Sequence, residues 1–394
     1  MSAPKLRFKE FAGNWPSVPL KDFVSFRKGK GISKADIQED GIFQCIRYGE
    51  LYTTYGQVIT TIKSRTNISP SESILSQNGD VIIPASGETQ IDIATASCVA
   101  KENVILGGDL NILSHQESGE WLAYYLSSAK KLEIAQLAQG NSVVHLYSSQ
   151  LKELKVNKPT KAEQTKIASF LSAVDEKISQ LTQKHQLLSQ YKQGMMQKLF
   201  SQQIRFKADD GSEFAEWEEK QLGDVCHFIN GRAYKQTEWE KEGTPVIRLQ
   251  NLTGSGKEYY YSTLNLPDHQ YCYNNDLLYM WSATFGPIFW QGEKAIFHYH
   301  IWKVEVEPQQ LDKQYMYYLL DEMTEKMKSS LNGSTMLHVT KQGMESTKKN
   351  LPSIEEQTKI ANFLSAIDQK IDVVSEQLEQ AKLWKKGLLQ QMFV

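Results

Sequence analysis

The sequence has few of the features that mark secreted, membrane or zinc-bound proteins. Its four cysteines are far apart and form no Cys-x-x-Cys pair, which argues against structural zinc and favours a reducing compartment. It has no apolar run of roughly 18 residues, so we expect no membrane span. The charged N-terminus, MSAPKLRFKEF, lacks the apolar core of a signal peptide. These absences predict a soluble, cytoplasmic protein.

Recognisable catalytic motifs are also missing. We find no Asn/Asp-Pro-Pro-aromatic methylation motif, no glycine-rich dinucleotide fingerprint and no GxxxxGK phosphate loop. His298 and His300 would share one face of a strand, but no third metal ligand lies near them. We therefore expect a non-catalytic chain that binds neither cofactor nor metal. Its net charge of −2 requires any nucleic-acid surface to be local.

Two stretches of the chain carry nearly the same sequence. Residues 163–200 and 356–393 align without a gap at an offset of 193 residues, and 17 of the 38 aligned positions are identical. Both stretches follow a proline and place apolar residues at alternating steps of three and four, which predicts long helices with a heptad coiled-coil seam. The predicted seam residues are Leu171, Val174, Ile178, Leu181, Leu188 and Met195 in the first helix, and Leu364, Ile367, Ile371, Val374, Leu378 and Leu388 in the second. Lys192 and Lys385 occupy matching seam positions, where a charge can fix register.

The repeat extends into the regions that precede the helices. Trp15, Leu20, Asp22, Phe26 and Gly29 match Trp217, Leu222, Asp224, Phe228 and Gly231 at an offset of 202, and Tyr124-Tyr125-Leu126 matches Tyr317-Tyr318-Leu319 at 193. The predicted parts are a globular domain at 1–158, a helix at 159–202, a second globular domain at 203–351 and a second helix at 352–394. The interiors of the two domains differ more than their frames, either because they recognise different ligands or because they drifted after duplication.

This layout resembles the specificity subunit of type I restriction–modification systems over essentially the full chain. The paired AEQTKIASFLSAVD and EEQTKIANFLSAID stretches and the Trp-x4-Leu-Gly-Asp-Val opening of the second half carry the resemblance. The first half departs from that opening at Lys21 and Phe23. The resemblance implies an α+β fold, with two α/β target recognition domains joined by two long antiparallel coiled-coil helices. It also implies double-stranded DNA, two methyltransferase subunits and restriction–translocase subunits as partners, with S-adenosylmethionine, ATP and Mg on those partners.

Candidate DNA contacts in the first domain are basic and small polar residues in loops. Phosphate contacts give affinity, whereas contacts to base edges give sequence specificity. The candidates are Arg27, Lys28, Lys30, Lys34, Arg47, Ser86, Gly87, Thr89 and His145. The alternatives are a solvated turn for the basic run, a structural salt bridge for Arg47, and a structural hydrogen bond for His145.

The second domain offers corresponding candidates. They are Arg232, Tyr234, Lys235, Arg248, Ser282, Thr284, His338 and Lys341. Arg47 and Arg248 follow matched strands, FQCIR and PVIR, so both are expected to reach a guanine edge unless they form structural salt bridges.

The leading hypothesis is a DNA-binding specificity subunit that recognises an asymmetric, two-part target. Helices of roughly 57 Å would set the separation of the two domains on DNA. The rival hypothesis is a pseudo-symmetric coiled-coil adaptor that binds only protein, and 21 acidic against 16 basic residues in 205–350 support it. An enzyme with catalytic residues hidden in the divergent loops is a third, weaker reading.

Overall fold

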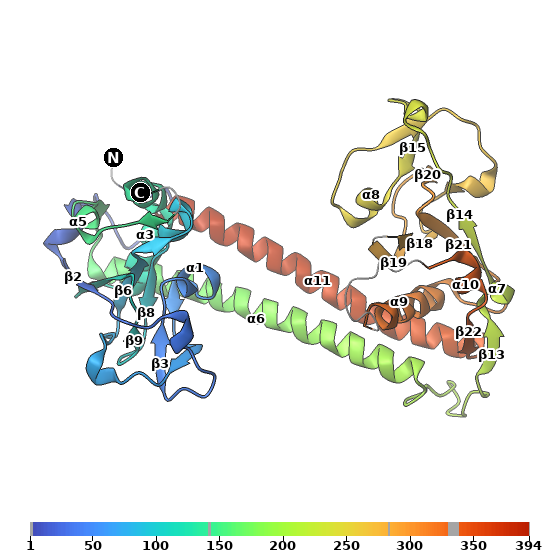
Figure 1. The fold of residues 1–394 in the computed structure, drawn as a ribbon, viewed down its shortest axis with the longest axis horizontal. Helices are drawn as coiled ribbons and strands as arrows, with labels where there is room; N and C mark the ends of the chain where they lie inside the picture. Colours follow the sequence, from blue (N-terminus) through green and yellow to red (C-terminus); the bar gives the residue numbers. More distant parts are fainter. Residues whose placement is uncertain (1–2, 141–142, 283, 330–338, 394) are drawn as a thin grey trace. The chain divides into compact units, whose positions relative to one another are not determined.

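The chain folds into two compact units that each combine β-sheets with short helices. The computed structural model describes residues 3–140, 143–282, 284–329 and 339–393. Unit 1 comprises residues 1–183 and 375–394, and unit 2 comprises residues 184–374. There are two long helices, α6 (Lys161–Phe200) and α11 (Ile354–Met392). About half of each helix belongs to unit 1 and the rest to unit 2 (Figure 1). The expected mixed α+β fold with an internal repeat is confirmed.

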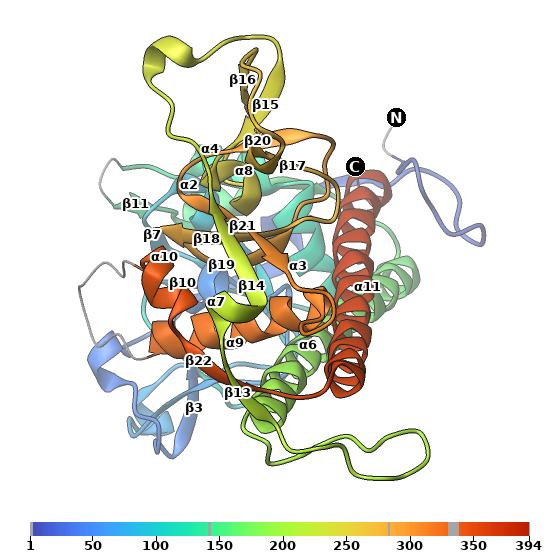
Figure 2. The same ribbon diagram turned by 90° about the vertical axis from the view of Figure 1, so that its right-hand side faces the viewer.

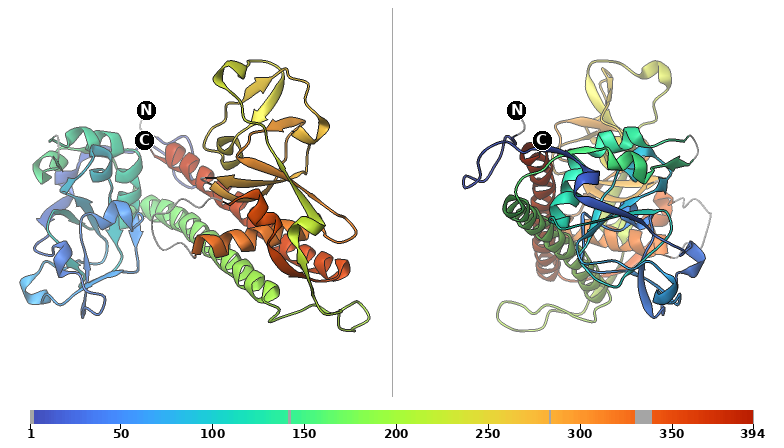
Figure 3. Two further views of the ribbon diagram at one scale, coloured as in Figure 1. Left: turned by 45° about the vertical axis from the view of Figure 1, so that its right-hand side comes forward. Right: turned by 90° about the vertical axis from the view of Figure 1, so that its left-hand side faces the viewer.

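Unit 1 contains two main sheets and five short α-helices within its described residues. The sheet orders are β2-β10-β6-β8-β4 and β5-β3-β9, with small pairs β1-β12 and β11-β7. Figure 3, right, shows the strands of this unit in blue to green. Its strands are β1 (Ser17–Pro19), β2 (Val24–Lys28), β3 (Phe43–Ile46), β4 (Val58–Ile59), β5 (Ser64–Thr66), β6 (Asp80–Pro84), β7 (Ser86–Gly87), β8 (Ser97–Val99), β9 (Ile105–Leu106), β10 (Leu110–His115), β11 (Val144–His145) and β12 (Lys155–Asn157). Its short helices are α1 (Glu50–Thr53), α2 (Gln90–Ile93), α3 (Gly119–Ser128), α4 (Lys131–Leu137) and α5 (Ser148–Lys152).

Unit 2 repeats this layout. Its sheet orders are β14-β21-β18-β19 and β16-β15-β20-β17, and the pair β13-β22 leads into α11 (Figure 2). Its strands are β13 (Glu218–Gln221), β14 (Cys226–Asn230), β15 (Thr244–Ile247), β16 (Tyr260–Ser262), β17 (Tyr271–Cys272), β18 (Leu277–Ser282), β19 (Thr284–Phe289), β20 (Ala295–Phe297), β21 (Ile301–Val306) and β22 (Lys348–Leu351). Its short helices are α7 (Leu222–Val225), α8 (Leu249–Thr253), α9 (Lys313–Ser329) and α10 (Lys341–Glu345).

The matched glycines Gly29 and Gly231 are explained by a close backbone approach in each unit. A Cβ atom on Gly29 would lie 1.9 Å from the carbonyl oxygen of Gly107, and one on Gly231 would lie 2.3 Å from that of His298. Only glycine allows the chain to pass so close. The repeat in the sequence therefore preserves the crossing point of two segments that are far apart along the chain.

The long helices pack against each other in opposite directions inside each unit. In unit 1, Phe170 of α6 contacts Trp384 of α11 with ring centres 5.9 Å apart. In unit 2, Leu199 of α6 shares a buried cluster with Ile360 and Leu364 of α11. Among the predicted seam residues, those that are buried are Leu171, Val174, Leu181, Leu364, Ile367, Val374 and Leu388, and those that are partly buried are Ile178, Leu188, Met195, Ile371 and Leu378.

The two seam lysines form reciprocal ion pairs. In unit 2, Lys192 of α6 lies 2.7 Å from Asp368 of α11, and in unit 1, Lys385 of α11 lies 2.5 Å from Asp175 of α6. Each aspartate also accepts a hydrogen bond from a tyrosine of the neighbouring domain helix. The Tyr124 hydroxyl of α3 is 2.6 Å from Asp175, and the Tyr318 hydroxyl of α9 is 2.7 Å from Asp368. We call each lysine–aspartate–tyrosine set a lock.

The locks correct the alignment of α3 with α9. The sequence match placed Tyr124 opposite Tyr317, but the hydrogen bonds make Tyr318 its counterpart, an offset of 194. The helix N-termini agree, because Gln164 accepts from the Ser118 amide and Gln357 accepts from the Asp312 amide. The alignment of Tyr-Tyr-Leu at an offset of 193 was therefore wrong by one residue, because it matched identical residues that do not occupy equivalent positions in the two helices.

A buried glutamate near the start of each long helix anchors the segment that leads into the globular domain of the same unit. Arg7 binds Glu163 through Nε at 2.7 Å and Nη2 at 2.9 Å, and Arg205 binds Glu356 through the same atoms at 3.1 and 2.8 Å. Paired bonds of this kind are strong and directional. The glutamate and the glutamine of each repeated Glu-Gln pair therefore have structural roles, the glutamate in this ion pair and the glutamine at the start of α3 or α9.

We predict that removing one lock charge destabilises its own unit. Lys192→Met leaves the partly buried Asp368 without its cation, which should reduce the unfolding free energy of unit 2 by about 1–3 kcal/mol. Hydrogen exchange of amides in 186–199 and 360–372 would measure the loss. The double variant Lys192→Met/Asp368→Leu should recover most of it, and exposed Lys370→Met should cause none. Unchanged exchange in Lys192→Met would contradict the lock.

Candidate nucleic-acid interface

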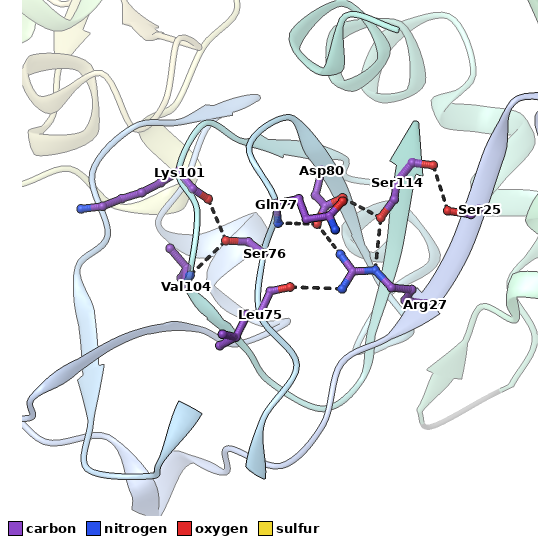
Figure 4. A network of polar contacts seen from close by, with 9 residues as sticks. All are labelled: Ser25, Arg27, Leu75, Ser76, Gln77, Asp80, Lys101, Val104 and Ser114. Carbon is purple, nitrogen blue, oxygen red and sulfur yellow. Dashed lines mark hydrogen bonds and ion pairs between the residues drawn. The ribbon is translucent and has the colours of Figure 1, made fainter. Parts of the chain in front are cut away.

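Arg27, the first predicted DNA contact, is bound to a buried carboxylate of unit 1. Its Nη2 lies 2.5 Å from Oδ2 of Asp80, and its Nη1 donates to the Leu75 carbonyl at 3.1 Å (Figure 4). The Asp80 side chain is only 2% exposed, so its charge needs a fixed partner. Ser114 adds a hydrogen bond to the other carboxylate oxygen, at 2.6 Å. The structure therefore assigns Arg27 to folding, and we no longer count it among the candidate contacts.

The rest of that basic run lies on the surface. Lys28, Lys30 and Lys34 are exposed, and none forms an ion pair with a described residue. The loop is nevertheless ordered, because the Lys30 amide donates to the Leu106 carbonyl at 3.1 Å and Ser33 caps the turn that follows. Three lysine ammonium groups thus stay available for phosphate.

The polar loop of unit 1 is more buried than the sequence predicted. Ser86 and Gly87 form β7, which pairs with β11, so Gly87 faces Val144 and Ser86 faces His145. Because Ser86 is 4% exposed, its side chain is not positioned for a groove edge. Thr89 is exposed and accepts a hydrogen bond from the Asp92 amide at the start of α2. We therefore keep Thr89 and the exposed His145, and withdraw Ser86 and Gly87.

The candidate contacts of unit 2 differ in whether their side chains are already paired with other residues of the unit. Arg232 pairs with Glu238 and lies over the ring of Tyr234, with 4.5 Å from its guanidinium carbon to the ring centre. Lys235 is exposed. Ser282 and Thr284 face each other at the end of the β18–β19 hairpin. Lys341 lies 3.4 Å from Glu345 on α10, and His338 lies outside the described residues.

Arg47 and Arg248 occupy the same place in the two units. Each follows a central strand, β3 or β15, that pairs in parallel with β9 or β20. The Arg47 amide donates to Glu50 at 2.7 Å, and the Arg248 amide donates to Asn251 at 2.9 Å. In both side chains Nε is buried without a hydrogen-bond partner, and no described residue forms a salt bridge with either. The structural salt bridges considered from the sequence are therefore absent from the described residues.

The sequence reasoning missed an aromatic cluster around Arg248. The cluster comprises Tyr234, Trp239, Tyr260 and His298. Trp239 lies 5.3 Å from Tyr234, 4.4 Å from Tyr260 and 6.2 Å from His298 between ring centres. The sequence did contain a signal for it. At the offset of 202, Tyr234 and Trp239 align with Ile32 and Ile37, so two aromatic residues of the second domain replace aliphatic residues of the first. Aromatic rings and arginine side chains occur together on nucleic-acid-binding surfaces, where bases stack on the rings.

Within the described residues, no histidine, cysteine, aspartate and glutamate cluster could hold a metal ion. His298 and His300 lie 5.3 Å apart between ring centres, but they are packed with aromatic neighbours rather than with further ligands. In the same part of the chain, no helix is both long and apolar enough to cross a membrane.

Comparisons with known proteins match this architecture. The family model for the type I restriction modification DNA specificity domain matches residues 12–190 and 215–383. These matches cover most of the chain, which therefore belongs to the family of type I restriction–modification specificity subunits, non-catalytic members of their enzymes.

Two relatives illustrate the similarity in sequence. The chain is 24% identical over 417 residues to the specificity subunit of the type I restriction enzyme MjaVIII from Methanocaldococcus jannaschii, covering 97% of this chain and 94% of the relative. It is 26% identical over 166 residues to the specificity subunit of the type I restriction enzyme EcoBI from Escherichia coli, covering 42% and 35%.

Two solved structures share the fold. The S subunit of a type I restriction–modification system from M. genitalium superimposes with a TM-score of 0.63 at 18% identity, covering 100% of this chain and 99% of the other. A chain from a structural study of complex assembly and conformational transition of the type I system gives 0.57 at 16%, covering 96% and 97%. At these identities the likeness establishes the fold alone.

We predict that acid destabilises unit 2 partly through His298. Burial, with His300 and Arg248 nearby, lowers the pKa of His298 to about 4. An unfolded histidine titrates near pH 6.5, so between about pH 6.5 and 4 the unfolded chain binds more protons and the unfolding free energy falls as pH falls. Melting temperatures at pH 7.5 and 4.5 should differ less in His298→Gln than in the wild type. The exposed control His145→Gln should keep the wild-type difference, and an equal difference in all three proteins would contradict the prediction.

Proposed function

We propose that this chain is the DNA-binding specificity subunit of a type I restriction–modification enzyme. It recognises an asymmetric, two-part target, with one half-site bound by each unit. It also carries methyltransferase and restriction–translocase subunits, and S-adenosylmethionine, ATP and Mg bind to those partners. The observation that carries this proposal is one scaffold built twice with different outward side chains.

The matched backbone supports recognition of two different half-sites. The Gly107 amide donates to the Ile46 carbonyl and the His298 amide to the Ile247 carbonyl, both at 2.9 Å. Yet the side chains that surround these bonds differ between the units. Equivalent backbones with different side chains would bind DNA in the same way and recognise different bases.

Charge alone does not favour DNA, and the protein-only adaptor remains the rival. The acidic excess of 205–350 lies in unit 2, where several cations are already paired. Lys28, Lys30 and Lys34 supply local positive charge in unit 1. The adaptor predicts no dependence of partner activity on DNA sequence, so the two functions are separable by experiment.

We predict that expression of the chain with its partner subunits produces methylation at one split DNA motif. Insertion of seven residues into both helices, after Gln183 and after Val374, would keep the heptad register and lengthen each helix by about 10 Å. At 3.4 Å per base pair, the gap between the motif halves should grow by about three base pairs. Sequencing of methylated bases would measure it. An unchanged gap would refute the proposed role of helix length, and no sequence-dependent methylation would favour the adaptor.

Partner docking has a matched candidate on each long helix. Tyr191 and Trp384 are separated by the same 193 residues as the helices and are 50% and 54% exposed. Large half-exposed aromatic rings are frequent anchors of protein interfaces. Two equivalent anchors fit two copies of the methyltransferase subunit.

We predict that each aromatic anchor holds one methyltransferase copy. Tyr191→Ala or Trp384→Ala should reduce the bound methyltransferase from two copies to one, and the double variant should abolish binding, as measured by native mass spectrometry. The matched controls Gln186→Ala and Glu379→Ala lie about 140° around each helix and should leave two copies bound. Two copies on the double variant would exclude these residues as anchors.

A further inference from the structure

The surroundings of Arg47 and Arg248 differ although their backbone positions correspond. Strand registers pair Cys45 with Ser64 in unit 1 and Val246 with Tyr260 in unit 2, so Ser64 and Tyr260 correspond. Likewise Ile37 corresponds to Trp239, since both belong to the small core beside the central strand. Unit 2 therefore has aromatic rings where unit 1 has a hydroxyl and an aliphatic side chain.

These rings hold the Arg248 guanidinium. Its central carbon is 4.2 Å from the ring centre of Tyr260 and 5.8 Å from that of Trp239. Trp239 in turn lies 4.4 Å from Tyr260. Stacking on rings fixes the plane of a guanidinium while leaving its hydrogen-bond donors free. No such ring contact is recorded for Arg47 among the described residues.

Arg248 also lacks a counter-ion among the described residues. Arg232 is paired with Glu238, whereas no described carboxylate lies within ion-pair distance of Arg248. Its side chain donates no hydrogen bond to a described residue, and its Nε is buried unpaired. Tyr260, over whose ring it lies, is 39% exposed. The result is a planar donor group that is oriented, charged and partly accessible.

We propose that Arg248 recognises a guanine in the half-site of unit 2, and that Tyr260 and Trp239 are positioning residues that orient it. This inference rests on the function proposed above. Guanine presents two acceptors, N7 and O6, at a spacing that a guanidinium fork matches, whereas adenine presents a donor in place of O6. A guanidinium held in one plane discriminates between them because it cannot rotate to satisfy another edge without losing the stack.

The test is the methylation motif produced by the complete complex with its methyltransferase subunits. Arg248→Gln should relax one guanine of one half-site, with methylation of sites that carry another base there rising roughly 5- to 150-fold relative to guanine sites. The other half-site should stay unchanged. Arg248→Lys keeps the charge and a donor for guanine but loses the planar fork, and should relax that guanine less than Arg248→Gln does. Lys257→Gln removes an equal charge from an exposed position of unit 2 and should leave the motif intact.

The positioning role has its own readout. Tyr260→Ala should weaken discrimination at the same base, and Tyr260→Phe, which keeps the ring face, should restore it. If both arginine variants lower methylation evenly at all sites without changing the motif, Arg248 contacts only phosphate and the inference is wrong. If Tyr260→Ala keeps the wild-type motif, Tyr260 does not position it. A wild-type complex without any split motif would instead overturn the proposed function.

Discussion

The pairing of Lys192 with Asp368, and of Lys385 with Asp175, is the constraint on which the arrangement of α6 and α11 depends. An apolar heptad seam is degenerate, because a slip of seven residues still brings apolar side chains together. Such a slip would move each lysine about 10 Å from its aspartate. Both charges would then be left in a partly apolar seam, which is costly. Apolar burial holds the helices together, but the charges select one register.

Each lock also fixes a recognition domain to the helix pair. The tyrosine that donates to the locked aspartate belongs to α3 in unit 1 and to α9 in unit 2. Burial and the adjacent aspartate raise the pKa of Tyr124 and Tyr318 above the ordinary tyrosine range, which keeps both hydroxyls protonated even at alkaline pH. One carboxylate thus satisfies a cation from the partner helix and a hydroxyl from the domain. Changing the helix register would therefore disturb the seating of the domain as well.

The frame of this protein was predictable from sequence, whereas the candidate site was predictable only in part. The repeated helices, the prolines before them and the seam lysines recur at a fixed offset, which can be read from the sequence alone. The structural role of Arg27 could not be predicted, because its partner Asp80 is 53 residues away and only folding brings the two side chains together. Ser86 was misjudged for the same reason, since its burial depends on β11. The cluster at Arg248 was missed because its members come from four separate segments that no local motif connects.

The two units share one frame but can carry different outward surfaces. Backbone hydrogen bonds at corresponding positions, and glycines where two segments almost touch, define each scaffold without using the outward side chains. Unit 1 has Ile37 and Ser64 where unit 2 has Trp239 and Tyr260. These differences change the surface, while the strands keep their pairing. The outward side chains can therefore vary at low cost in stability, provided that the locks and the buried arginine–glutamate pairs are kept. The scaffold is held together from within, and that leaves its outer side chains free to differ.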